Sequence, residues 1–207
     1  MRSFYRSLLA AVAALVAAAA AHATPLVEKI VNQLEASPSS CTAVAEGNPE
    51  RQLIEADISR FLAVAEVPAD VRFQVLDCPD DGFVHQGRTI VISTRLSRLP
   101  LSQRFFILAH ELGHVQLQHH AATSRFVAEA IKGARDERTA RARVYSGLAA
   151  ISHRAELDAD AYAVRLMRKA GIEPEQAARL FDSIGEGKDT KTHPSAARRA
   201  RSIRSTL

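Results

Sequence analysis

The sequence contains no tryptophan and only 5% aromatic residues, which argues against a stacking platform for carbohydrate or single-stranded nucleic acid. It has two cysteines in 207 residues, too few for a scaffold built on disulfides or for a four-cysteine zinc site. Apolar residues make up 47% and charged residues 24%, which are the values of an ordinary soluble domain and exclude a disordered chain. A chain of this length can bury a sizeable core.

The only long apolar run lies at the N-terminus. Arg2 and Arg6 precede an uninterrupted apolar run over residues 8–21, and Ala-His-Ala at 21–23 fits the small-x-small rule for signal cleavage. The run is shorter than the roughly 20 residues that span a bilayer, and no cysteine ends it, which argues against a lipoprotein. We therefore expect a cleaved signal peptide over residues 1–23 and a periplasmic destination. An uncleaved anchor and a buried core helix are the alternatives.

Export changes how the charge and the cysteines are interpreted. Residues 1–23 contain two arginines and no acid, so without them the formal net charge falls from +4 to +2, too little for a nucleic-acid footprint. In an oxidising compartment two remaining cysteines usually pair. We expect a disulfide between Cys41 and Cys78, with two buried free thiols as the alternative. This disulfide would close a loop of about 38 residues and stabilise the fold by about 4 kcal/mol.

Hydrophobic periodicity predicts an α+β fold that is mostly helical, with a small sheet. Alternating residues predict two strands, over 71–76 and 88–93, with a turn at 79–82. No linker divides the chain, so we expect residues 24–207 to form a single domain. The predicted helices cover residues 26–35, 49–64, 101–120, 121–132, 137–170, 174–184 and 194–203.

Residues 110–114 form an H-E-x-x-H motif in a helical stretch. Residues four apart point about 40° from each other on a helix, so His110 and His114 leave the same face and can bind one zinc ion. Glu111 lies about 100° round the helix, beside the metal, where it can take the proton of a water molecule. The alternative is a solvated helix face with two surface histidines.

Two imidazoles leave a zinc site incomplete, so a third protein ligand is required. His120 would fit the longer pattern H-E-x-x-H-x-x-G-x-x-H, but that pattern needs glycine where this chain has Leu117. If the helix continues, His119 and His120 point about 140° and 120° away from His114. We therefore expect neither of them to bind the metal.

A better third ligand lies downstream, in the helical pattern E-x-x-A-D. The carboxylate of Glu156 would complete a site of two imidazoles and one carboxylate. One turn later, Asp160 can accept the outer N–H of a ligand imidazole and fix its tautomer. Ala159 is small enough to let two helices approach closely. The alternative is an exposed acidic helix face.

These motifs resemble those of M48-type zinc metallopeptidases, the gluzincin group that includes HtpX and the CAAX prenyl protease. The similar segments are residues 110–120, residues 154–175, and the Thr-His-Pro sequence at 192–194 followed by Arg199. The membrane helices of those two proteins are missing here, so the soluble periplasmic branch is the closer comparison.

The resemblance implies a zincin-like fold with one zinc ion per chain. It also implies that the strand over residues 88–93 is the sheet edge beside the active-site cleft. The residue roles that it implies are zinc binding by His110, His114 and Glu156, general base catalysis by Glu111, and support of a ligand by Asp160.

His193 precedes Pro194, so its backbone is extended at the start of a helix. Three roles are open for it: a structural cap, a hydrogen-bond donor in the transition state, or a fourth ligand that keeps the site latent. Tyr162 and Arg199 are rival donors.

The residues and the resemblance predict a zinc-dependent endopeptidase that cuts extended, misfolded or stalled envelope proteins. A non-hydrolytic, zinc-bearing binding protein of chaperone type is the alternative, but it would not need Glu111. Arginine clusters over residues 135–143 and 198–204 are expected to be solvated helix faces rather than a nucleic-acid interface. Such faces could lie near anionic lipid or outer-membrane assembly partners.

Overall fold

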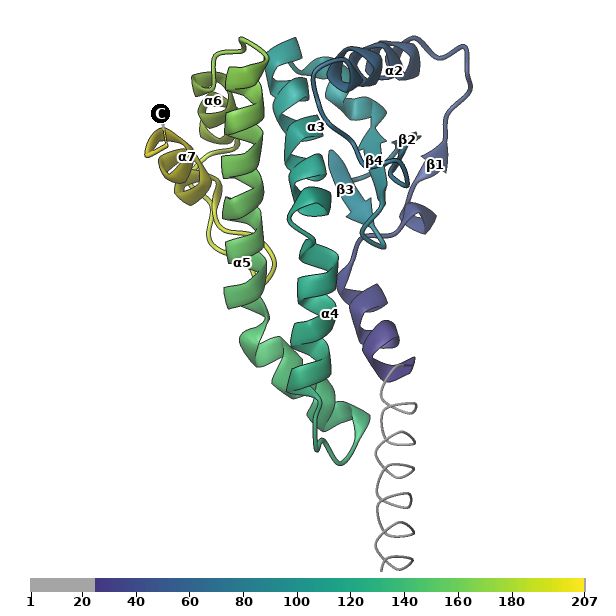
Figure 1. Cartoon of the computed structure of the whole chain (residues 1–207), viewed down its shortest axis with the longest axis vertical. Helices are drawn as coiled ribbons and strands as arrows, with labels where there is room; N and C mark the ends of the chain where they lie inside the picture. Colours follow the sequence, from purple (N-terminus) through teal and green to yellow (C-terminus); the bar gives the residue numbers. More distant parts are fainter. Residues whose placement is uncertain (1–24, 207) are drawn as a thin grey trace, which may run out of the picture.

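The computed structural model of the chain describes residues 25–206, so the expected signal peptide, residues 1–23, lies outside the described residues. Helices predominate beside a small mixed sheet, which confirms the predicted α+β class (Figure 1). In chain order the elements are a helix over residues 25–34, η1 (Pro38–Ser40), β1 (Thr42–Ala43), α2 (Pro49–Leu62), β2 (Arg72–Asp77), β3 (Gly82–His85), β4 (Thr89–Ser93), η2 (Thr94–Arg98), α3 (Leu101–Gln116), α4 (His119–Ala130), α5 (Glu137–Lys169), α6 (Glu175–Ile184) and α7 (Ala196–Arg204).

The sheet has the strand order β1-β2-β4-β3, with β2 and β4 parallel and the other neighbours antiparallel. The sequence predicted only β2 and β4, and β3 begins within the predicted turn, at Gly82. The prediction that residues 88–93 form the sheet edge is wrong, because β4 lies between β2 and β3. Ile90, Val91 and Ile92 are fully buried, and such a continuous apolar run is typical of a strand covered on both faces. The two edge strands of this sheet are β1 and β3.

Helix α3 lies between the sheet and α5 (Figure 1). Helix α6 packs on α3 and α7, and α7 also contacts α5. Gly113 permits the close approach of α3 and α5, because a Cβ there would lie 3.2 Å from both Cα and O of Ala159. Ala159 is itself fully buried. The main apolar core gathers side chains from α2, β4, η2, α3, α5, α6 and α7, so the helix that carries the H-E-x-x-H motif is held from several sides.

The predicted helix over residues 101–120 is wrong at its end, since α3 stops at Gln116 and α4 starts at His119. Gln118 has φ 54°, in the left-handed region that residues other than glycine rarely adopt. The break lets α4 pack on the N-terminal helix, where Val127 contacts an apolar cluster with Ile30. Tertiary packing therefore overrides the local preference for a continuous helix.

A disulfide, apolar packing and the pairing of β1 with β2 attach the N-terminal part of the described chain to the rest. A disulfide joins Cys41 to Cys78, which directly follows β2. The helix over residues 25–34 places Ile30 and Val31 against α4 and the start of α5. Within residues 25–206, no helix is both long enough and apolar enough to cross a membrane.

Candidate metal centre

Helix α3 presents both imidazoles of the H-E-x-x-H motif to the same point. The preceding turn of the helix, from Phe105 to Leu108, is buried in the core, which fixes the face that the motif occupies. The Nε2 atoms of His110 and His114 lie 3.1 Å apart. His110 is buried and His114 is partly exposed, so the pair lies where the core meets the surface.

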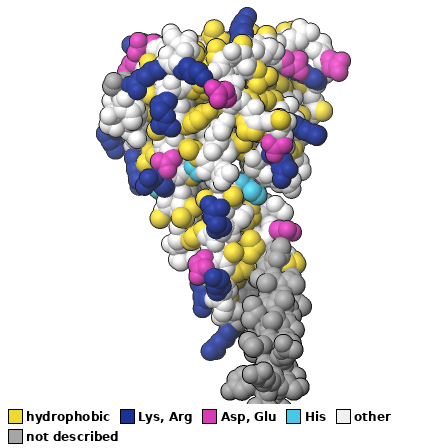
Figure 2. Space-filling view, in the orientation of Figure 1, with side chains coloured by type: hydrophobic (Ala, Val, Ile, Leu, Met, Phe, Trp, Pro, Cys, Tyr) yellow, Lys and Arg dark blue, Asp and Glu magenta, His cyan; other side chains and the backbone are white. Residues whose placement is uncertain are grey.

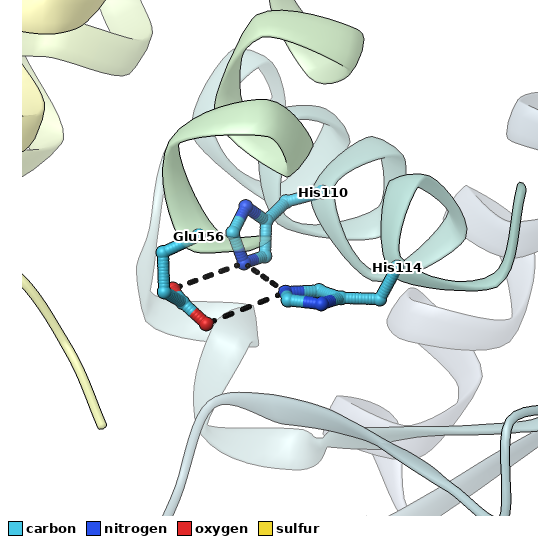
Figure 3. A group of neighbouring side chains, drawn as sticks. All are labelled: His110, His114 and Glu156. Carbon is cyan, nitrogen blue, oxygen red and sulfur yellow. Dashed lines mark hydrogen bonds and ion pairs between the residues drawn. The ribbon is translucent and has the colours of Figure 1, made fainter. Parts of the chain in front are cut away.

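Glu156 of α5 reaches the same point from the neighbouring helix (Figure 3). Its Oε1 lies 3.4 Å from His114 Nε2, and its Oε2 lies 3.5 Å from His110 Nε2. Two ligand atoms on a tetrahedral zinc ion, each at about 2.0–2.1 Å, are about 3.3 Å apart. The structure therefore brings the three residues predicted to bind zinc to the spacing of three corners of such a site.

The state of the Glu156 carboxylate also points to a cation. Its Oε2 is buried and has no hydrogen-bond partner among residues 25–206, although Arg199 Nη1 lies 3.0 Å away. A buried oxygen without a hydrogen bond is costly, and a bound cation would offset that cost. Burial would raise the pKa of Glu156, but the two imidazoles hold it well below its ordinary value, so the carboxylate is ionised. Two imidazoles and one carboxylate fit zinc.

Asp160 contacts His110 on the side of the ring away from the metal position, and Arg199 of α7 forms an ion pair with Asp160. The Oδ1 atom of Asp160 lies 2.9 Å from His110 Nδ1, and Arg199 donates two hydrogen bonds to the same carboxylate, at 2.6 and 2.8 Å. Burial and Arg199 lower the pKa of His110, but the hydrogen bond to Asp160 and the neighbouring Glu156 carboxylate outweigh them and raise it to about 9. With its outer nitrogen donating to Asp160, His110 turns Nε2 towards the metal position.

His119 contacts the other imidazole, which the sequence did not predict. Its Nδ1 lies 2.9 Å from His114 Nδ1. The expectation that His119 points away assumed a continuous helix, and it is wrong because the chain turns at Gln118. His120 instead contacts Glu35 through its Nδ1, and neither histidine belongs to the group of three ligand atoms. Burial and His114 lower the pKa of His119 to about 4.

Glu111 lies beside the three ligands and lines a cleft of about 430 Å³. Burial raises the pKa of Glu111, while His110 and His114 oppose this rise. A carboxylate with a raised pKa is better matched to proton transfer near neutral pH. Gly82, at the start of β3, packs against it, because a Cβ there would lie 3.3 Å from both Cγ and Oε1 of Glu111.

The cleft has a strand on one side and helices on the other. The edge strand β3 contributes Phe83 and Val84, and residues 34–36 border the same cleft after the N-terminal helix. Because β3 is the sheet edge, one side of its backbone has no neighbouring strand in the sheet. The apolar lining on the helical side comes from Phe106, Ile107, Leu180, Phe181 and Ile184.

His193 reaches the cleft from the loop between α6 and α7. Its Nε2 lies 3.8 Å from Glu156 Oε1, and its side chain is 60% exposed. Thr190 closes the loop, because its Oγ1 accepts a hydrogen bond from His193 N at 2.9 Å. The N-cap of α7 is Ser195, so the capping role considered for His193 is wrong. The roles of transition-state donor and fourth ligand stay open.

Two residues matter more than the sequence suggested. His153 donates from Nε2 to Thr190 O at 2.7 Å and accepts at Nδ1 from Arg198, so it anchors the loop that carries His193. Arg199 was a rival donor only, but it is the ion-pair partner of Asp160. No local pattern reveals a partner 39 residues away; the similarity of the Thr-His-Pro segment and the arginine after it was the only signal.

Of the eight arginines in the two arginine-rich stretches, four form ion pairs within the described residues. On the face shown in Figure 2, Lys and Arg side chains are interspersed with Asp and Glu side chains. Arg141 pairs with Glu137 on α5, and Arg204 pairs with Asp182 of α6. Arg199 is the exception within its stretch, because it points into the metal centre.

Comparison with protein-family models identifies a family for most of the chain. The sequence model of peptidase family M48 matches residues 49–207, from the start of α2 to the end of the chain. This part contains His110, Glu111, His114 and Glu156, whereas the helix over residues 25–34 precedes it. No curated protein matches the chain.

Proposed function

The chain belongs to peptidase family M48, a family of metallopeptidases, and we propose that it is a zinc-dependent endopeptidase of misfolded or stalled envelope proteins. The observation that carries the proposal is the meeting of His110, His114 and Glu156 around one point, with Glu111 beside them in a cleft. Residues 24–207 form one peptidase domain in this account.

The reaction divides between the metal and the side chains around it. When bound by the three ligands, zinc would lower the pKa of a water molecule and polarise the scissile carbonyl. Glu111 takes the proton of that water as its oxygen attacks the carbonyl carbon, and then gives the proton to the leaving amine. His193, at the border of the cleft, donates a hydrogen bond to the oxyanion. Binding the metal as a fourth ligand is its alternative role.

The substrate is an extended polypeptide that adds to the free edge of β3. Main-chain hydrogen bonds to a strand give affinity with little dependence on sequence. Unfolded proteins offer such extended segments, whereas folded proteins do not. The short β3 and the apolar lining from α3 and α6 support this mode of binding.

The place of action is the periplasm. The expected signal peptide over residues 1–23 and the disulfide between Cys41 and Cys78 support an oxidising compartment. The exposed Arg135 and Arg138, at the N-terminal end of α5, support a position near anionic lipid or outer-membrane assembly partners.

Cleavage of an unfolded protein by the wild type and by Glu111→Gln tests the proposal. General base catalysis contributes about 10²–10⁴-fold, so the variant should keep its zinc and lose hydrolysis by that factor. A matched control, Glu129→Gln, changes an exposed glutamate of α4 and should leave the rate unchanged. A chelator should stop the wild type, and zinc should restore it.

Unchanged cleavage by Glu111→Gln would refute its role as base. A wild type that binds unfolded chains and zinc but cuts nothing would favour the non-hydrolytic binding protein.

A further inference from the structure

The outer nitrogens of the two imidazoles, Nδ1 of His110 and Nδ1 of His114, have different hydrogen-bond partners. Asp160 and Arg199 lie behind His110, whereas the outer nitrogen of His114, Nδ1, lies 2.9 Å from His119 Nδ1. The rings of His114 and His119 meet edge to face, with centroids 4.9 Å apart and planes inclined at 76°. At this distance one ring nitrogen donates a hydrogen bond to the other.

The direction of this hydrogen bond follows from the placement of His114. Its Nε2 faces Glu156 Oε1 at 3.4 Å and His110 Nε2 at 3.1 Å, on the side where a metal would bind. A ligand nitrogen needs a lone pair, so the proton of a neutral His114 must be on Nδ1. His114 Nδ1 therefore donates and His119 Nδ1 accepts, with the proton of His119 on its Nε2.

The fold holds His119 in place at the cost of an unusual backbone conformation. Gln118 adopts φ 54° and ψ 41°, and His119 follows as the first residue of α4. Such a left-handed conformation at a residue other than glycine persists where the surrounding structure enforces it. Here α3 is fixed in the main core, and α4 is fixed by Val127 against the N-terminal helix. The turn between them presents the ring of His119 to His114.

We propose that His119 is a positioning residue of the metal centre, which orients the ring of His114 and fixes its tautomer. The inference rests on the proposed function, because it assumes that His114 binds zinc through Nε2. Removal of an outer hydrogen-bond partner of this kind typically weakens metal binding or activity by about 10–100-fold.

Three substitutions separate the hydrogen bond from packing. His119→Ala removes both the ring and the acceptor, and His119→Phe keeps a ring without an acceptor. His119→Asn places an amide oxygen close to the position of Nδ1, because both atoms are bonded to Cγ. His120→Asn is the control, since the ring of His120 contacts Glu35 and no metal ligand.

The measurements use the full chain. Competition with a chromogenic chelator gives the zinc affinity, and the visible absorption spectrum of the cobalt-loaded protein reports the geometry of the ligands. We expect His119→Ala and His119→Phe to bind zinc about 10–100-fold more weakly, with a changed cobalt spectrum. His119→Asn should recover most of the affinity, and His120→Asn should match the wild type.

Equal zinc affinity in the wild type and in His119→Phe would overturn the inference and leave the proposed function intact. Equal losses in all four variants, the control included, would also overturn it, because damage to the start of α4 would then be the cause. A wild-type chain that binds no zinc would instead overturn the proposed function.

Discussion

Replacement of Asp160 by alanine would deprive a buried positive charge of its main partner. The Asp160 side chain is 1% exposed and Arg199 is 12% exposed, and two hydrogen bonds of 2.6 and 2.8 Å join them. Removing one partner of a buried ion pair costs about 3–5 kcal/mol. Because Glu156 Oε2 remains 3.0 Å from Arg199 Nη1, we expect a loss at the lower end, about 3 kcal/mol in the free energy of unfolding.

Urea unfolding in the presence of a chelator measures this loss without a contribution from bound metal. The matched variant Asp160→Asn keeps an oxygen that can accept from His110 Nδ1, so it should lose less. Replacing both partners, Asp160→Ala with Arg199→Met, removes the unpaired charge. The double variant should therefore be more stable than the two single losses imply when added. Strictly additive losses would refute the reasoning, because they would show that the two side chains do not stabilise each other.

Two further predictions concern the contact of α3 with α5 and the protonation of the site. Gly113→Val should lower the free energy of unfolding by about 1–3 kcal/mol or more, because the new side chain would clash with the Ala159 backbone. The control in the same urea assay is Gly47→Val, because no atom lies within 4 Å of a Cβ at Gly47. Equal stability of the two variants would contradict the packing argument. The raised pKa of His110, about 9, means that zinc must displace a proton at pH 7. Zinc affinity should therefore rise about tenfold per pH unit between pH 6 and 8 and level off near pH 9. An affinity independent of pH over that range would show that zinc displaces no proton from His110.

The metal-binding residues could be predicted because helix geometry alone sets their directions. The spacing of His110 and His114 on one helix determines that they share a face. Glu156 stood out because two imidazoles require a third ligand, and its helical pattern continues to Asp160. Local helix geometry and the chemistry of zinc are therefore sufficient to identify these residues.

The other parts of the site depend on contacts between distant segments. The four residues of β3 have no clear strand pattern, and they form a strand because they pair with β4. The position of His119 depends on the left-handed backbone conformation of Gln118. That conformation is expected at glycine, so a glutamine gives no sign of it in the sequence. Arg199 meets Asp160 only through the packing of α7 on α5.

The metal content of the purified chain tests the central claim most directly. Elemental analysis should find one zinc ion per chain in the wild type and in Glu111→Gln, since Glu111 lies beside the ligands. It should find almost none when His110 and His114 are both replaced by alanine, because one carboxylate alone holds zinc weakly. Zinc retained at one equivalent by that double variant would contradict the account.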